Sequence, residues 1–388
     1  MTTKPWTILS IAFRPFFLLS ALFGIVGLLL WLSVLHGFGW APAAADPVAW
    51  HAHEMLFGFA GAAIAGFLLT AVATWTGRPP VAGPVLGALV VAWIAGRCAM
   101  ALGPVLPDPA VAGADLAFPV FLAAIALREI VGGGSRRNFG IAAVLAAFAA
   151  LDGVFHLGRS GLWPGAERVA LSLTAYGLLV LITVVGDRII PSFTGNWLKL
   201  RGDPVLPRSR PWVEALLVPF VILAGIADSL GLPAIVVAVL SLATAALHAL
   251  RLSGWRGHCT SAEPLVAILH VAYAWLPIGY LLLGLAALGL PLPRSAALHA
   301  LTMGGIGTMI LAVTTRVALG HTGRRLEAAP LTVVAYVVLN AAVLVRILSP
   351  LLAGSYLAFI DIAAAGWIAA FGLFLAVYWP ILTRPRSS

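Results

Sequence analysis

Two histidines and a glutamate stand together in the segment Trp50–Phe59, which reads WHAHEMLFGF. Imidazole and carboxylate groups bind metal ions and transfer protons. Because they are energetically costly inside a membrane, their presence there indicates such a role. On an α-helix His51 and Glu54 share a face, whereas His51 and His53 lie about 200° apart. One metal does not easily take both histidines of a helical segment, but two sites on opposite sides of the helix can each take one.

The composition of the chain defines the environment of these groups. The 388 residues are 61% hydrophobic and 10% charged, and the mean hydropathy is +1.03. A soluble domain cannot cover its surface with so few polar side chains. The sequence therefore predicts a polytopic membrane protein that folds within a lipid bilayer.

Apolar segments of about 20 residues are long enough to cross the hydrocarbon layer as helices. Twelve such segments are predicted, which makes the fold an all-α bundle of transmembrane helices and places residues 1–388 in a single integral-membrane domain. The segments cover roughly 15–37, 51–74, 83–103, 110–130, 139–157, 168–190, 212–231, 233–252, 265–289, 295–317, 330–349 and 354–381. The longest connection, about Pro191–Pro211, is basic.

The distribution of basic residues predicts the orientation. With twelve spans, 18 of the 23 Lys and Arg residues lie at the termini or after even-numbered spans. The side with more Lys and Arg faces the cytoplasm, so both termini are expected there. The same distribution accounts for the net charge of +9 without nucleic acid as a partner.

The two cysteines exclude several cofactors. Cys98 and Cys259 fall towards opposite faces of the membrane, so no disulfide is expected, and the chain has no CxxC motif. Covalent c-type haem, iron–sulfur clusters and thiolate zinc are therefore disfavoured.

The remaining histidines sort by depth in the membrane. His53, His270 and His299 are predicted inside the apolar layer, with His51 at its border. His270 and His321, on the cytoplasmic side, are candidates for a separate site. The other histidines are predicted to be structural or solvated, among them His36, His156, His248 and His258.

The segments around His51 and His53 and around His299 could also bind a haem. The run LHALTMGGIGTM around His299 resembles the Trp50–Phe59 region in looser form, and glycines below each histidine (Gly58, Gly61, Gly304, Gly305 and Gly307) leave room for a porphyrin face. One b-type haem is thus expected between the predicted spans 51–74 and 295–317, with His299 opposite His51 or His53. Whichever of His51 and His53 does not bind this haem would bind a second metal, haem or copper, with Glu54 as ligand or proton carrier.

Arginines at helix ends can pair with haem propionates. The candidates are Arg14, Arg78, Arg188 and Arg316, and Arg324 lies in a TGR turn that parallels the turn at Arg78 and is predicted to clamp a cofactor. Asp152 and Asn340 are candidates for helix–helix hydrogen bonds, and Asp152 alternatively for a proton path.

Long motifs resemble one known family. FRPFF at 13–17, WHAHEMLFGF, DRIIPSFTGNW at Asp187–Trp197, LHALTMGGIG and TRVALGHTGR at Thr315–Arg324 are similar to the NnrS family of bacterial membrane proteins, over essentially the whole chain. The resemblance implies a twelve-span inner-membrane protein with one or two haems b and with copper, associated with nitrosative stress and denitrification. It also adds weight to His321, which matches a motif histidine.

Three function classes remain open. The favoured one is a redox protein that binds nitric oxide and reduces it to nitrous oxide, with electrons from quinol or another membrane donor and protons through Glu54. The second is a non-catalytic haem or copper protein that binds NO and protects other centres. The third is a twelve-span transporter, disfavoured by the absence of an evident internal repeat.

Overall fold

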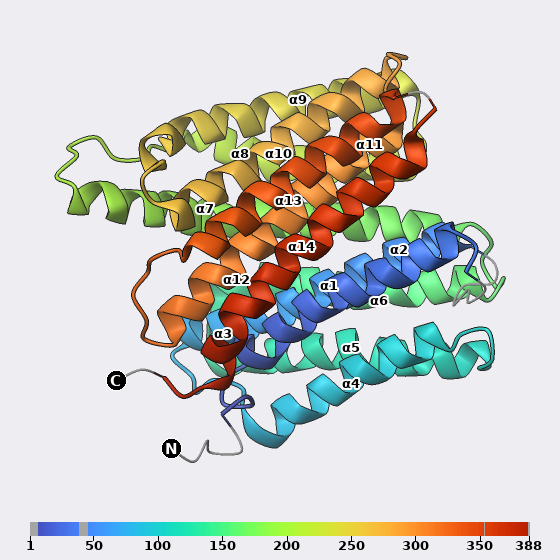
Figure 1. Ribbon diagram of the computed structural model, residues 1–388, viewed down its shortest axis with the longest axis horizontal. Coiled ribbons are helices and arrows are strands. Elements are labelled where there is room, and N and C mark those ends of the chain that lie inside the picture. Colours follow the sequence, from blue (N-terminus) through green and yellow to red (C-terminus); the bar gives the residue numbers. More distant parts are fainter. Residues whose placement is uncertain (1–6, 39–45, 353, 387–388) are drawn as a thin grey trace. The chain divides into compact units, whose positions relative to one another are not determined.

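The computed structural model describes residues 7–38, 46–352 and 354–386 of the chain, and in these residues it is helical without any β-strand. Figure 1 shows the elements. Their bounds are α1 Phe13–Leu35, α2 Pro47–His53, η1 Glu54–Ala60, α3 Gly61–Thr76, α4 Gly83–Ala101, α5 Asp108–Gly132, η2 Arg136–Asn138, α6 Phe139–Arg159, α7 Ala166–Leu200, α8 Pro211–Ser229, α9 Ala234–Gly254, η3 Gly257–Thr260, α10 Pro264–Ala287, α11 Arg294–His299, η4 Ala300–Gly307, α12 Thr308–His321, α13 Pro330–Leu348, η5 Ser349–Leu351 and α14 Tyr356–Thr383.

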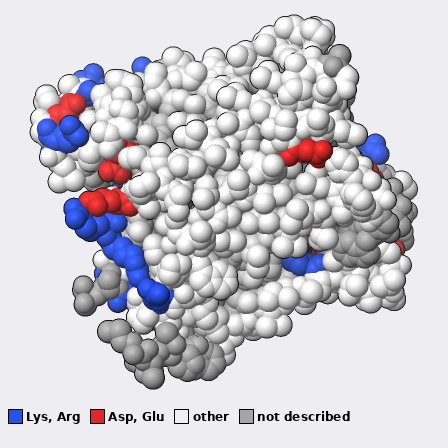
Figure 2. Space-filling view, viewed as in Figure 1, with Lys and Arg blue, Asp and Glu red and all other residues white. Residues whose placement is uncertain are grey.

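Among the described residues, twelve helical segments are long and apolar enough to cross a membrane, which confirms the predicted number and the all-α fold class. α2, η1 and α3 form one of these segments, and α11, η4 and α12 form another. Figure 2 shows a face on which uncharged residues predominate, as contact with lipid requires. The chain is therefore a multi-pass membrane protein.

Two helices end later than the hydropathy predicts. α7 runs to Leu200 rather than to about residue 190, so Pro191 lies inside the helix and the basic connection to α8 is shorter than expected. Proline lacks an N–H and commonly ends or kinks a helix, but membrane helices tolerate it where neighbouring groups satisfy the backbone. α12 likewise extends to His321 rather than to about residue 317.

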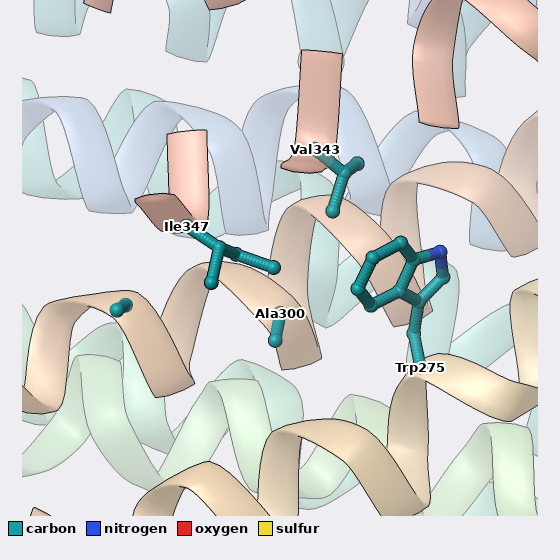
Figure 3. Close-up of a cluster of buried hydrophobic side chains, with 5 residues drawn as sticks. Trp275, Ala300, Val343 and Ile347 are labelled. Atoms are coloured by element: carbon teal, nitrogen blue, oxygen red, sulfur yellow. The ribbon is translucent and has the colours of Figure 1, made fainter. Parts of the chain in front are cut away.

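The contacts divide the chain into two compact units. Unit 1 consists of the described residues of Met1–Thr174, Val317–Arg325 and Phe374–Ser388, and unit 2 of Ala175–Arg316 and Leu326–Leu373. Each has its own buried core. In unit 2, Trp275 packs against small and branched side chains from α11, η4 and α13, which include Ala300, Val343 and Ile347 (Figure 3). The Trp275 indole N–H donates to Asn340 Oδ1 at 2.8 Å, so the predicted helix–helix hydrogen bond of Asn340 is confirmed.

Both segments that contain the histidine motifs include a π-helix. η1 begins at Glu54, directly after His53, and η4 begins at Ala300, directly after His299. A π-helix has i→i+5 hydrogen bonds, is rare, and is frequent at functional sites. Donors from neighbouring helices stabilise η1: Trp93 Nε1 donates to Gly58 O at 3.1 Å, and Ser20 Oγ donates to Phe59 O at 2.9 Å.

Gly58 is a position where only glycine fits. A Cβ atom there would lie 2.4 Å from Cε1 of Phe23 and 3.1 Å from Cδ of Arg97. We expect Gly58→Ala to lower the free energy of unfolding by about 1–3 kcal/mol, the usual cost of overpacking. Thermal melting in detergent measures the effect. Gly113→Ala is the matched control, because nothing lies within 4 Å of that position, and an equal loss of stability in both variants would contradict the packing argument.

Candidate metal centre

His53 is the most enclosed of the histidines in the Trp50–Phe59 motif. Its side chain is fully buried, and both ring nitrogens face carboxylates. Nδ1 lies 3.0 Å from Glu54 Oε1, and Nε2 lies 2.9 Å from Asp152 Oδ1 and 3.1 Å from Asp115 Oδ2. The predicted helix–helix hydrogen bond of Asp152 is thereby confirmed, with His53 as its partner.

A second histidine joins this group from α6. His156 Nε2 lies 2.9 Å from Asp115 Oδ2 and 3.8 Å from Asp152 Oδ1. His53, Asp115, Asp152 and His156 each offer one ligand atom, and these four atoms lie within 4.8 Å of one another. We call these four residues the His53 cluster. Asp152 and His156 are i,i+4 on α6 and share a face, which is why one helix supplies two of the four groups.

The His53 cluster is joined to a buried arginine. Arg97 on α4 donates to Glu54 Oε1 through Nη1 and to Asp115 Oδ1 through Nη2. Three carboxylates, those of Glu54, Asp115 and Asp152, therefore meet one guanidinium and two imidazoles inside unit 1. Protons on the histidines, or a metal cation among the ligand atoms, complete the balance of charge that burial requires.

Aromatic rings pack against His53 inside the cluster. The His53 ring stacks on Phe155 with a centroid distance of 4.2 Å and lies 4.7 Å from Phe57. Phe57 in turn packs against Phe148 at 4.6 Å. Charges interact more strongly in so apolar an environment than in water, because little solvent screens them.

The donor set fits a metal ion. Two imidazole nitrogens and two carboxylate groups suit iron, copper, zinc or manganese, and no thiolate is present to select a softer ion. Asp152 Oδ2 is buried without a hydrogen-bond partner among the described residues, although nearly all buried carboxylate oxygens have one. A cation bound by Asp152 would satisfy this atom.

A porphyrin does not fit beside His53. The faces of Gly58 and Gly61 were expected to leave room for it, but Phe23 covers Gly58, and Phe118 and Phe148 cover Gly61. The same holds in unit 2, where Trp275 covers Gly304, Leu276 covers Gly305 and Trp367 covers Gly307. These glycines thus admit large side chains of neighbouring helices, a use of glycine that sequence alone does not distinguish from a cofactor face.

His51 and His299 have surroundings of other kinds. His51 is half-buried and stacks on Trp31 with a centroid distance of 4.7 Å, so it and His53 contact different neighbours, as their angular separation predicts. His299 Nδ1 lies 2.7 Å from the carbonyl oxygen of Ser295. Because a carbonyl only accepts, Nδ1 carries the proton and Nε2 the lone pair, which is the tautomer usual for a metal-binding histidine.

His270 and His321 occupy different units. In unit 2 the Thr194 hydroxyl donates to Ile190 O, so His270 Nε2 donates to Thr194 Oγ1 at 2.8 Å, which leaves the lone pair on Nδ1. His321, in unit 1, is exposed at the end of α12, and its ring lies 5.7 Å from that of Phe13.

The five arginines expected to pair with propionates or to clamp a cofactor lie in different surroundings. Arg14 is buried and donates to the carbonyl oxygens of Leu382 and Arg384, Arg78 pairs with Glu129 at 2.6 Å, and Arg316 lies 4.0 Å from the centroid of the Phe193 ring. The other two, Arg188 and Arg324, are half-buried. The partners of Arg14, Arg78 and Arg316 give each of these side chains a structural role.

Three members of the site were missed by the sequence interpretation. Arg97 was counted with the basic residues that determine orientation, His156 was considered structural or solvated, and Asp115 was not singled out. Each is ionisable and lies within an apolar span, which is by itself an indication of function in a membrane protein. That rule would have selected them, but not their convergence on His53.

The structure thus defines a class: multi-pass helical membrane proteins with a buried cluster of histidines and acidic residues between their helices. A comparison with protein families places the chain more narrowly. Residues 7–386 match the family described as NnrS protein, and the chain belongs to this family. The resemblance noted from the motifs is therefore confirmed. A search among curated proteins found no match. Family membership supports a membrane protein of nitric oxide stress, in a family generally associated with metal or haem binding.

Proposed function

We propose that this protein binds nitric oxide at a metal ion held by the His53 cluster and reduces it to nitrous oxide. The observation that carries the proposal is the convergence of four buried ligand atoms within 4.8 Å, together with the second carboxylate oxygen of Asp152, which has no hydrogen-bond partner among the described residues. Iron or copper, when bound, would supply the redox chemistry that NO reduction requires.

The residues of the cluster would share the work of holding the ion. His53 and His156 provide imidazole nitrogens, and Asp115 and Asp152 provide carboxylate oxygens. Arg97 fixes the second oxygen of Asp115, so that the other oxygen, Oδ2, faces the two histidines. Ligands that are oriented by a further hydrogen bond bind metals more tightly than mobile ones.

Glu54 is placed to supply protons. The reaction converts two NO, two electrons and two protons into N₂O and water, and the electrons would come from quinol or another membrane protein. Glu54 is buried, lies 3.0 Å from His53 Nδ1 and is not among the four ligands, so it can exchange a proton with the ring of His53. The apolar rings around the site do not obstruct NO, which is itself small and apolar.

Turnover tests this function. The purified protein, loaded anaerobically with iron or with copper, receives an excess of NO and an artificial electron donor, and an NO electrode records consumption. We expect consumption far beyond one NO per metal, with N₂O as product, and a rate about 100-fold lower in Glu54→Gln, as for loss of a proton-transferring group. Glu129→Gln is the control, because Glu129 is also a buried carboxylate of unit 1 but pairs with Arg78 and Arg128.

Two results would change the conclusion. Consumption that stops at one NO per bound metal would support the non-catalytic, protective function instead. The absence of any NO binding by metal-loaded protein would contradict both.

The visible spectrum tests the expected haem b separately. His299 is the other predicted axial ligand, but Trp275, Leu276 and Trp367 cover the glycine face that was expected to receive the porphyrin there as well. Loss of b-type bands in His299→Ala, with the bands unchanged in His53→Ala, would assign the haem to His299. Bands that disappear only in His53→Ala would contradict the interpretation that phenylalanine side chains exclude a porphyrin there.

A further inference from the structure

Basic side chains gather at the end of unit 1 where α1 begins and where α12 and α14 end. Arg14, in the first turn of α1, donates through Nη1 to the carbonyl oxygens of Leu382 and Arg384, both at 2.7 Å. Arg324, in the connection that follows α12, is near enough to Arg14 and Arg384 for the charges to repel each other. We call Arg14, Arg324 and Arg384 the Arg14 cluster.

The Arg14 cluster has no carboxylate partner among the described residues. Within that part of unit 1, the arginines that pair with carboxylates are others, namely Arg78, Arg97, Arg128, Arg159 and Arg168. Arg14 is nevertheless only 4% exposed. Its Nε and the Nη1 of Arg324 are both buried without a hydrogen-bond partner among the described residues. Positive charge is therefore withdrawn from water here without a negative charge beside it, which is costly.

Neither the helix ends nor the loss of a proton removes this charge. The C-terminal end of a helix carries about half a negative charge, which α14 offers to Arg14, but α1 begins at the same place with about half a positive one. Burial and the charge of Arg384 hold the pKa of Arg324 below its ordinary value, yet a guanidinium stays protonated in proteins. A bound anion would supply the missing negative charge.

The position of the Arg14 cluster along the helices corresponds to the level of lipid headgroups. Arg14 stands at the start of its membrane span, and Arg324 and Arg384 follow shortly after the ends of theirs. Trp379, close to the end of α14, is 52% exposed, and tryptophan is enriched where the hydrocarbon meets water. Arg384 is exposed, so an anion can reach the cluster from the membrane surface.

We propose that the Arg14 cluster binds a phosphate group at the membrane surface, supplied by the headgroup of an anionic lipid such as phosphatidylglycerol or by free phosphate. Guanidinium groups bind phosphate through charge-assisted, often paired hydrogen bonds, and basic pockets between membrane helices bind anionic headgroups. Arg324, whose Nη1 has no partner among the described residues, would donate to the phosphate. The bound phosphate would hold the end of α14 and the connection after α12 against the beginning of α1.

Lipid binding by the purified full-length protein tests the site. Delipidated protein in a non-ionic detergent is titrated separately with short-chain phosphatidylglycerol, with the zwitterionic phosphatidylcholine and with inorganic phosphate, and native mass spectrometry and thermal melting record binding. We expect phosphatidylglycerol to bind more tightly than phosphatidylcholine, and Arg324→Gln to weaken its binding about 10-fold, as for loss of a charged hydrogen bond. Arg137→Gln is the matched control, because it removes an exposed arginine of unit 1 in η2 and should bind as the wild type does.

Melting without lipid distinguishes an anion site from a structural arginine. Arg324→Gln should then melt at the wild-type temperature or above it, because it removes a charge that repels Arg14, and a lower temperature would overturn the proposal. Inorganic phosphate that binds as tightly as phosphatidylglycerol would identify free phosphate as the source, and binding of the lipid alone would identify the headgroup.

Two further results would overturn the site. One is equal affinity of the wild type and Arg324→Gln for both phosphatidylglycerol and phosphate. The other is a b-type haem spectrum that Arg324→Gln alters, which would assign the cluster to a propionate instead. Because the titrations need neither a metal nor NO, the phosphate site and the proposed NO chemistry can fail independently.

Discussion

Replacing Asp152 with asparagine is expected to remove the metal from the His53 cluster. The substitution keeps the shape of the side chain but takes away a negative charge and the unpartnered oxygen Oδ2. Residues that only orient a metal ligand change affinity by 10–100-fold, so loss of a ligand should lower it by about 100-fold or more. The measurement is the metal content of purified protein after dialysis against a known free concentration of iron or copper.

The control separates loss of the site from general damage. Glu129→Gln removes a buried negative charge from α5, the helix that also carries Asp115, but outside the cluster. It should retain about one metal per chain, as the one set of ligands found among the described residues predicts. Equal metal content in wild type and Asp152→Asn would mean that the metal, if present, is bound elsewhere.

Replacing Arg97 with methionine should cause the largest loss of stability. Arg97 is the only guanidinium in contact with Glu54 and Asp115 among the described residues, and removing one partner of a buried ion pair leaves an uncompensated charge. Such changes typically lower the free energy of unfolding by about 3–5 kcal/mol. Unfolding in mixed micelles, measured without added metal, gives the difference.

Two further variants make this result specific. Arg159→Met breaks a partly exposed pair with Asp108 in the same unit and should cost only about 0–1 kcal/mol. The double variant Arg97→Met/Asp115→Asn should recover part of the lost stability, because it removes one of the stranded charges. If the double variant instead loses as much stability as the two single variants together, Arg97 and Asp115 contribute to stability independently.

The sequence was sufficient for the fold and for the family. Twelve apolar segments are visible because each must span the hydrocarbon with its own residues, which is a local property of the chain. The predicted segments 212–231 and 233–252 correspond to α8 and α9, and Gly231, with a φ of +63°, lies in the turn between them. The later ends of α7 and α12 were missed because hydropathy marks where an apolar run ends, whereas a helix can continue beyond it.

Only some residues of the candidate site could be predicted from the sequence. His53 and Glu54 were selected since they adjoin in the sequence, and Asp152 was suspected of bonding another helix. Arg97, Asp115 and His156 come from three other helices, and nothing in their own segments indicates that they meet. The glycines led to a wrong prediction of a porphyrin face. In sequence, a glycine that admits a phenylalanine ring cannot be distinguished from one that admits a porphyrin.

The π-helix at Glu54–Ala60 has a consequence for comparing this chain with relatives. A turn with i→i+5 hydrogen bonds holds one residue more than an α-helical turn, so it is equivalent to a single-residue insertion that the helix absorbs without a loop. A relative lacking that residue would keep an unbroken helix, yet everything on one side of the deletion would turn by about 100° relative to the other. An alignment gap of one position within this span would therefore separate proteins that can present His53 to Asp115 and Asp152 from proteins that cannot, even where all the ligand residues are conserved.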